Sequence, residues 1–503
     1  MDGGIADWIA RRALRRPEAE ALVDVATGAR HTYAALDRRI GARAAALAAL
    51  GVGAGARVAL LGENSAAYLE WLFGAARLGA ITVPVNHRLA PGEVAHVLAD
   101  SGATVLVRSA AFATLAEDAL AAGGDAVGSV SSVVELAEEP GDQALEARPV
   151  AGDDPCVIMY TSGTTGVPKG AVLTHDNMLW NAINMVTAGP GIGGTDVTIA
   201  AAPLFHIGAL GLSALPPLYA GGTVVVVPSF APAAFVELMA REGVTTQFLV
   251  PAMWAALTRL AAVPPMRDLR WAISGGAPCP VTVIEHFTRL GWTFTEGFGM
   301  TELSPAALFL DARDVLTHAG SVGRPFMHVD AQLVDGSGEE VGVGEVGELA
   351  LRGPTVFAGY WNRPEATAEV VRDGWFHSGD LGIRDADGFV TLVDRKKDMI
   401  ISGGENVYPV EVEQVLHRHP GVADVAVIGV GDPTWGETVV AVVVPEGSVD
   451  PDEVIGFARE RIAHFKAPRR VEIVDELPRN ATGKLLKRVL RERYAGRAEA
   501  VAR

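Results

Sequence analysis

The sequence of 503 residues predicts an α/β fold with a large N-terminal domain and a small α+β C-terminal domain. Short apolar runs rich in β-branched residues alternate with Ala/Leu-rich segments of helical length up to residue 390. This alternation is typical of largely parallel sheets covered by helices. A change to short strands with Gly turns near residue 325, and a change in charge balance near residue 395, indicate further subdivision.

The elements follow in order along the chain. Residues 1–22 lack the uncharged apolar core of a signal peptide and predict a short amphipathic helix with arginines on its polar side. Five apolar runs then predict strands at 56–64, 80–86, 103–109, 222–229 and 269–276. Near residue 325 the pattern favours a β-barrel-like subdomain. We therefore expect two α/β sheet subdomains and a barrel-like one within 1–394, and a small mobile domain over 395–503.

Residues 197–236 contain no Asp, Glu, Lys or Arg, a length that could suggest a membrane span. Five prolines and the pair Gly221-Gly222 would interrupt a continuous helix there. The segment is therefore interpreted as a buried strand-and-helix region, and no integral membrane segment is expected.

Charge and cysteine content limit the function. The formal charge of −18 lies entirely in residues 1–394, because residues 395–503 carry equal numbers of basic and acidic side chains. A pI near 5.1 argues against a nucleic-acid surface. Cys156 and Cys279 are too few for a disulfide framework or a Cys-based zinc site, which fits a reducing cytoplasm.

The strongest motif is the run of small and hydroxyl residues from Tyr160 to Gly170, which follows an apolar run and precedes a predicted helix. Small residues let backbone N–H groups approach an anion, hydroxyls add donors and Lys169 adds charge. The spacing between Gly166 and Lys169 does not match the Walker A pattern. The sequence therefore predicts a phosphate loop of another kind.

This loop resembles the signature of the adenylate-forming superfamily, which includes acyl-CoA synthetases, peptide-synthetase adenylation domains and beetle luciferases. Further motifs match in the same order: Pro203–His206, Ser274–Pro278, Glu296–Glu302, Trp375–Asp380, Asp394–Asp398 and Leu477–Lys484. The resemblance implies a large multi-subdomain N-terminal domain, a mobile C-terminal domain, and an enzyme that uses ATP, CoA and Mg²⁺.

The resemblance also implies roles for individual residues. Lys484 would bridge the attacking carboxylate and the α-phosphate, His206 would gate the carboxylate end of the acyl site, and Glu302 would bind Mg²⁺, with Thr161 also at the reacting centre. Asp380 and Arg395 would hold the ribose, and Phe298 would stack on adenine. The remaining ATP-binding residues would be Ser162, Gly163, Thr164, Thr165, Gly166, Lys169, Gly275, Gly276, Ala277, Pro278, Glu296, Gly297, Gly299, Met300 and Thr301.

For the second half-reaction the resemblance implies rotation of the small domain about Lys397, with Gly403 and Gly404 lining a CoA channel. The acyl pocket would be lined by Phe205, His206, Gly208, Gly211, Val250, Met253, Trp254 and Gly275. Cys279 is read as a packing residue, because its motif supplies no activating group.

The choice of substrate is less constrained. The absence of an acidic residue between Asp196 and Glu237 argues against an amino acid. A non-catalytic binding protein would be expected to lose some charged motif residues, but five are present: Lys169, Glu302, Asp380, Arg395 and Lys484. In their residues, the motifs resemble those of bacterial fatty-acyl-CoA ligases and, nearly as closely, those of hydroxycinnamate (feruloyl)-type ligases. We favour a medium- or long-chain fatty acid, with a hydroxycinnamate as the alternative. A homodimer is left open.

Overall fold

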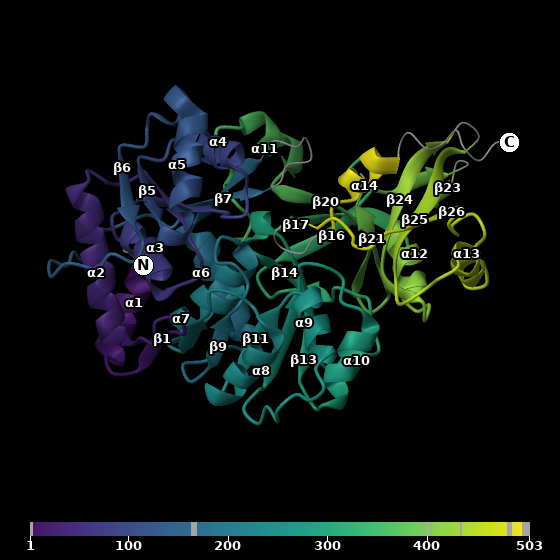
Figure 1. The fold of residues 1–503 in the computed structure, drawn as a ribbon, viewed down its shortest axis with the longest axis horizontal. Coiled ribbons are helices and arrows are strands. Elements are labelled where there is room, and N and C mark those ends of the chain that lie inside the picture. Colours follow the sequence, from purple (N-terminus) through teal and green to yellow (C-terminus); the bar gives the residue numbers. More distant parts are fainter. Residues whose placement is uncertain are drawn as a thin grey trace. The chain divides into compact units, whose positions relative to one another are not determined.

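A computed structural model gives the fold, and it describes residues 4–161, 168–395, 398–402, 405–432, 435–479 and 485–494. The chain divides into two compact units (Figure 1), one of Met1–Asp330 with Leu351–Phe376 and the other of Ala331–Ala350 with His377–Arg503. This division by compactness differs from the expected domain boundary at 394/395, which stays a prediction.

The first unit contains a seven-stranded sheet with the order β18-β8-β7-β4-β3-β5-β6. Strands β3, β4, β5 and β6 run parallel, β7 is parallel to β4, and β8 is antiparallel to β7. The strands are β3 (Arg57–Leu61), β4 (Ile81–Val85), β5 (Val105–Arg108), β6 (Ser132–Glu135), β7 (Pro155–Thr161), β8 (Lys169–Thr174) and β18 (Gly359–Tyr360). The structure thus confirms the strands predicted within 56–64, 80–86 and 103–109.

Helices of this unit form because their apolar positions recur at helical spacing, and three of those described below also have a side-chain cap at their first turn. The Thr32 hydroxyl caps α2 (Tyr33–Ala49), and the Ser65 hydroxyl caps α3 (Ala66–Arg77). Helix α4 (Pro91–Ser101) and helix α5 (Ala113–Gly123) contribute to one hydrophobic cluster with strands β3, β4 and β5. Helix α6 (His175–Thr187) begins in a capping box formed by Thr174 and Asn177.

Two further sheets of the first unit have the orders β2-β1-β10-β9 and β11-β12-β13-β14-β15. Their strands are β1 (Glu20–Asp24), β2 (Arg30–Thr32), β9 (Val197–Ala200), β10 (Thr223–Val226), β11 (Thr246–Leu249), β12 (Trp271–Gly275), β13 (Phe294–Gly299), β14 (Ala306–Leu310) and β15 (Arg324–Pro325). The buried Gln247 amide links the sheets, since its Nε2 donates to the Ile199 carbonyl (2.9 Å) and its Oε1 accepts from the Ile199 N–H (3.1 Å). This side chain therefore continues the backbone ladder from β11 to β9.

The uncharged segment 197–236 forms strand β9, a π-helix over Ala209–Ala214, helix α7 (Leu215–Ala220), strand β10 and the start of helix α8 (Pro232–Arg241). Most of its residues are buried. The expected strand-and-helix interpretation is confirmed. Within the described ranges, every helix is too short or too polar to cross a membrane.

The region near residue 325, expected to be barrel-like, forms a five-stranded sheet with the order β16-β17-β20-β19 and with β21 beside β20. These strands are β16 (Asp330–Val334), β17 (Val346–Arg352), β19 (Val371–Arg372), β20 (Trp375–Arg384) and β21 (Val390–Arg395). Helix α11 (Pro364–Val370) precedes β19, and helices α9 (Pro251–Thr258) and α10 (Val281–Arg289) follow β11 and β12.

The C-terminal part of the second unit is a small α+β body, as predicted. Its sheet has the order β23-β22-β25-β24, and β26 pairs with β25. Alternation along β24 (Val422–Asp432) and β25 (Gly436–Pro445) divides the apolar side chains between two faces. One face packs with α12 (Pro409–Leu416) and α13 (Pro451–Arg459), and the other with α14 (Lys487–Tyr494). The remaining strands are β22 (Ile400–Ser402), β23 (Glu405–Val407) and β26 (Arg470–Ile473).

Candidate active site

The two strands on either side of the predicted phosphate loop are paired at the residues next to the loop. Thr161, the last residue of β7, pairs with Lys169, the first residue of β8. The Thr161 hydroxyl lies 3.5 Å from the Lys169 carbonyl, to which it donates. The structure therefore brings together two of the predicted ATP-binding residues, while Ser162, Gly163, Thr164, Thr165 and Gly166 lie outside the described residues.

Tyr360 on β18 connects Lys169 with Glu302, the predicted magnesium ligand. The Tyr360 hydroxyl donates to Glu302 Oε1 at 2.8 Å, and Lys169 Nζ lies 5.3 Å from the centre of the Tyr360 ring. Burial, followed by the negative charge of Glu302, raises the pKa of Tyr360, so the phenol remains a donor at neutral pH. Tyr360 belongs to none of the predicted motifs. The need of a buried carboxylate for a donor could have indicated such a partner, but not its identity.

The backbone around Glu302 is fixed from two sides. Glu302 is only 5% exposed, and its carbonyl accepts from the Phe357 N–H (2.9 Å). The Asn177 amide donates to the carbonyls of Pro354 (2.8 Å) and Val356 (2.9 Å), just before Phe357. One carboxylate held in this way fits Mg²⁺, which usually binds one or two protein carboxylates together with phosphate oxygens.

The predicted adenine residues gather at one edge of the sheet that contains β12. Strands β11, β12 and β13 are parallel, so their carboxyl ends meet there. Residues Gly276, Ala277 and Pro278 are exposed at this edge, and Gly276 has a φ of 89° that suits glycine. Gly297, Phe298, Gly299 and Met300 are partly exposed beside them, followed by the buried Thr301. The structure thus brings this predicted set together.

Glu296 differs from its neighbours because its side chain is buried. Its Oε1 accepts from the Cys279 N–H at 3.2 Å. Burial raises the pKa of Glu296 to about 8, so the side chain is largely protonated at neutral pH. Burial likewise raises the pKa of the Cys279 thiol, which is the opposite of what an activated nucleophile needs. Cys156 is also a buried free thiol.

The Phe205-His206 element begins in a loop held by Asn64. The Asn64 amide donates to the carbonyls of Ala200 (3.2 Å) and Ala202 (2.8 Å), and its oxygen accepts from the Leu204 N–H (2.7 Å). Phe205 is buried and packs edge-on against His87, with 5.0 Å between ring centres. His206 is partly exposed directly after it. Asn64, which no motif indicated, therefore orients the predicted gate.

Two of the three predicted acyl-pocket glycines, Gly208 and Gly275, lie against one aromatic side chain, Phe248 of β11. A methyl group added at Gly208 would lie 3.3 Å from the Phe248 ring, and one added at Gly275 would lie 3.4 Å from it. Phe248 is only 4% exposed. The absence of side chains at both glycines thus makes room for this ring.

Two further residues of the predicted acyl pocket, Val250 and Gly211, have different neighbours. Val250 contacts the place that a methyl group at Gly276 would occupy (3.8 Å), and Gly211 packs against Pro305. The Asn181 amide donates to the Gly211 carbonyl at 2.6 Å within the π-helix. The structure thus places Gly208 and Gly275 around Phe248, a residue that no motif indicated, and the acyl pocket itself stays a prediction.

Trp254 does not fit the predicted acyl pocket. It is completely buried, its Nε1 donates to the Ile273 carbonyl (3.1 Å), and its ring packs against Phe287, Trp292 and Phe294. These contacts make it a core residue between helices α9 and α10 and the sheet. Its half-buried neighbour Met253 remains a candidate for the pocket.

In the second unit, Asp380 lies on β20, where it pairs in register with Arg395 of β21. The Asp380 N–H donates to the Ser378 hydroxyl (3.1 Å), which donates to the Leu349 carbonyl (2.7 Å). The Gly379 N–H donates to Glu348 Oε1 at 3.2 Å. This local network holds the strand that carries the predicted ribose ligand. Lys397, Gly403, Gly404 and Lys484 lie outside the described residues, as does the side chain of Arg395.

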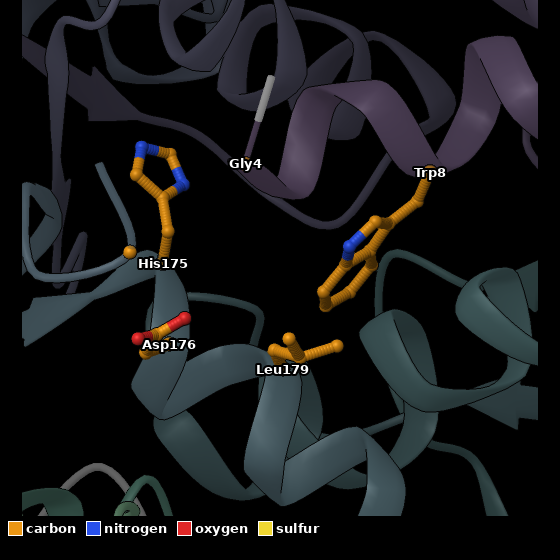
Figure 2. Close-up of a pocket in the computed structure, with 6 residues that line it drawn as sticks. Gly4, Trp8, His175, Asp176 and Leu179 are labelled. Carbon is orange, nitrogen blue, oxygen red and sulfur yellow. The ribbon is translucent and has the colours of Figure 1, made fainter. Parts of the chain in front are cut away.

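A cavity of about 240 Å³ lies between α1 (Gly4–Arg15) and α6, away from these motifs. Figure 2 shows Trp8 from α1 opposite His175, Asp176 and Leu179 from α6. His175 Nδ1 accepts from the Ile5 N–H at 3.2 Å, and burial lowers the pKa of His175 to about 4. None of the predicted site residues lines this cavity, and its histidine anchors the start of α1.

Comparison with known proteins agrees with this geometry. The chain is 46% identical to a feruloyl-CoA synthase of Amycolatopsis sp, over 98% of this chain and 99% of the relative. It is 38% identical to a long-chain-fatty-acid–CoA ligase of Mycobacterium tuberculosis, over 97% and 98%. The structure of o-succinylbenzoate CoA synthetase from Bacillus subtilis, in complex with its acyl-adenylate intermediate, matches with a TM-score of 0.88, 31% identity and coverage of 97% and 98%.

Two family models match the chain. The AMP-binding enzyme model covers residues 9–361, and the model of the C-terminal domain of AMP-binding enzymes covers residues 411–484. These regions contain the phosphate-loop strands, Glu302 and Tyr360 in the first unit and most of the small α+β body in the second. The chain therefore belongs to the AMP-binding enzyme family and is an adenylate-forming acid–thiol ligase.

Proposed function

We propose that this ligase converts a hydroxycinnamate-type aromatic acid into its CoA thioester. The carboxylate attacks the α-phosphorus of ATP and releases pyrophosphate, and the thiol of CoA then displaces AMP from the acyl-adenylate. The observation that carries the proposal is the 46% identity to a feruloyl-CoA synthase over nearly the whole of both chains, against 38% for a fatty-acid ligase.

The first step brings two anions together, so the site must neutralise charge. Lys169 and the Thr161 hydroxyl would contact phosphate oxygens. Glu302 would hold Mg²⁺, which supplies positive charge to the phosphates when it is bound. Tyr360 orients the Glu302 carboxylate through its 2.8 Å hydrogen bond.

The residues of the second unit complete the proposal. Asp380 and Arg395 would bind the ribose hydroxyls, and Lys484 would bridge the carboxylate and the α-phosphate. The small domain would rotate about Lys397 between the two half-reactions. Gly403 and Gly404 would line the path of CoA. Two buried free thiols support a reducing, cytoplasmic location.

The position of Phe248 supports an aromatic acid. Its ring contacts the positions of Gly208 and Gly275, two predicted pocket residues, so a substrate ring bound there would meet a flat apolar side chain. A planar ring can pack on such a wall in an offset or edge-to-face arrangement. A long flexible chain would instead need a deep tunnel past the same position.

A fatty acid, the substrate that sequence analysis favoured, is the second candidate. The uncharged lining contributed by residues 197–236 and the 38% identity to a long-chain-fatty-acid ligase favour it.

The deciding experiment is CoA-dependent pyrophosphate release with the purified enzyme. The acids are C2–C18 fatty acids, benzoate, cinnamate, 4-hydroxycinnamate and ferulate, compared by kcat/KM. We expect ferulate or 4-hydroxycinnamate to exceed every fatty acid by at least about tenfold, the effect of roughly 1.4 kcal/mol in transition-state binding. A higher kcat/KM for a C8–C18 acid would refute the aromatic assignment and establish the second candidate.

A further inference from the structure

Helix α4 contacts strand β7 and the residue that precedes strand β8, on either side of the phosphate loop. Its residues His96 and Asp100 lie four positions apart and therefore on the same face of the helix. We propose that His96 and Asp100 are positioning residues that hold Thr161 and Lys169 in place for the triphosphate of ATP. This inference rests on the ATP-activating part of the proposed function and is independent of which acid is used.

Asp100 fixes the end of β7. Its Oδ2 accepts from the Tyr160 hydroxyl at 2.7 Å, and its Oδ1 accepts from the Arg363 guanidinium at 2.6 Å. The Asp100 side chain is only 11% exposed, so the carboxylate is largely shielded from water, although the Arg363 side chain is 42% exposed. Tyr160 immediately precedes Thr161, and successive side chains of a strand point to opposite faces. Restraining the Tyr160 ring on one face therefore restrains where Thr161 points on the other.

His96 fixes the start of β8. Its Nε2 lies 3.4 Å from the carbonyl oxygen of Pro168, the residue before Lys169. The His96 ring also meets the Tyr160 ring edge-on, with 6.5 Å between their centres. One face of α4 thus contacts the residue before Thr161 and the residue before Lys169.

The same carboxylate also reaches the segment that carries Tyr360. Arg363 follows Tyr360 by three residues, and the Trp361 indole donates to the Asp100 carbonyl at 3.2 Å. The Trp361 N–H donates to the Gly170 carbonyl at 2.7 Å, next to Lys169. Figure 1 shows α4 close to β7 and α11, consistent with these contacts. Asp100 therefore links the strand ends to the partner of Glu302.

Docking of α4 does not require these polar side chains. Its apolar residues Val94, Ala95, Val97 and Leu98 already pack in the hydrophobic cluster with the sheet. His96 and Asp100 direct their hydrogen bonds to residues next to predicted ATP ligands. This distribution is what a positioning role requires.

The test separates the two half-reactions in the full-length enzyme. The readout is the KM for ATP in acid-dependent ATP–pyrophosphate exchange. Asp100→Ala should raise this KM by roughly tenfold or more, and Tyr160→Phe by about threefold. Both variants remove hydrogen bonds that involve the charged Asp100 carboxylate. Thioester formation from preformed acyl-adenylate needs no triphosphate. Its rate in both variants should therefore stay within about twofold of the wild-type rate.

Three further variants distinguish a positioning role from misfolding. Glu93→Gln changes a carboxylate on the same helix that accepts from the Ala90 N–H at its first turn, and it should leave the KM for ATP unchanged. His96→Leu should raise the KM, whereas His96→Gln, which keeps a side-chain N–H for the Pro168 carbonyl, should largely restore it.

Two outcomes would overturn the inference. One is a KM for ATP within twofold of wild type in both Asp100→Ala and Tyr160→Phe, and the other is a parallel loss of both half-reactions. If none of the tested acids supported ATP–pyrophosphate exchange by the wild-type enzyme, the proposed function would fail rather than this inference. Calorimetric ATP binding would then decide this inference, and an unchanged Kd in Asp100→Ala would refute it.

Discussion

Replacing Tyr360 with phenylalanine tests whether Glu302 is a magnesium ligand oriented by the phenol. The variant removes only the hydroxyl that donates to Glu302 Oε1 at 2.8 Å. The ring stays, so Lys169 keeps its aromatic neighbour at 5.3 Å. The change is therefore confined to the carboxylate.

The expected size follows from the burial of Glu302, which is 5% exposed. A hydrogen bond to a charged group contributes about 1.5–3 kcal/mol, and water has little access to replace it. Loss of a partner that orients a metal ligand typically lowers metal affinity by about 10- to 100-fold. We expect the Mg²⁺ concentration for half-maximal ATP–pyrophosphate exchange to rise within that range, with a smaller effect on the KM for the acid.

Tyr33→Phe is the matched control. The Tyr33 hydroxyl is also buried and donates to the Gly222 carbonyl at 2.7 Å, and its hydrogen bonds reach none of the predicted ATP ligands among the described residues. Both variants should lose thermal stability, and only Tyr360→Phe should change the Mg²⁺ dependence. Equal Mg²⁺ curves for the two variants would refute the role of Glu302.

Three other changes give distinct outcomes. Phe248→Ala should shift kcat/KM toward bulkier acids and lower stability by about 3–5 kcal/mol, measured by urea unfolding and the acid screen; unchanged selectivity would remove Phe248 from the pocket. Glu296→Gln should gain stability over wild type as pH rises. The raised pKa of Glu296 makes folding bind a proton, so wild-type stability falls between about pH 4.5 and 8, by at most about 1.4 kcal/mol per pH unit; a Tm difference that stays constant with pH would contradict this. Lys484→Ala should abolish adenylation and preserve thioester formation from acyl-adenylate, and equal loss of both half-reactions would exclude the bridging role.

Much of the fold followed from local patterns. Runs such as those at 80–86 and 103–109 combine β-branched residues with polar or glycine boundaries, and each became a buried strand. Prolines in 197–236 correctly argued against one long helix. The π-helix over Ala209–Ala214 and the Gln247 link between two sheets have no local signal, because both depend on tertiary contacts.

The candidate site was predictable where motifs carry it and not elsewhere. Glycine and charged residues at fixed spacing indicated Lys169, Glu302 and the strand ends near Gly275. Phe248 and Tyr360 act through residues distant in sequence, so only the fold reveals them. Trp254 shows the opposite error, since an aromatic residue near a pocket motif can as readily fill the core.

The Gln247 amide has a consequence for how this enzyme could change its substrate. Because it replaces a strand pairing between β9 and β11, the chain segment that leads to His206 and the strand that carries Phe248 form one unit. Under the proposed assignment, a substitution at Phe248 would reshape the acyl pocket while the predicted gate at His206 keeps its position. Substrate range and reaction chemistry could thus diverge independently, one side chain at a time, during evolution of such ligases.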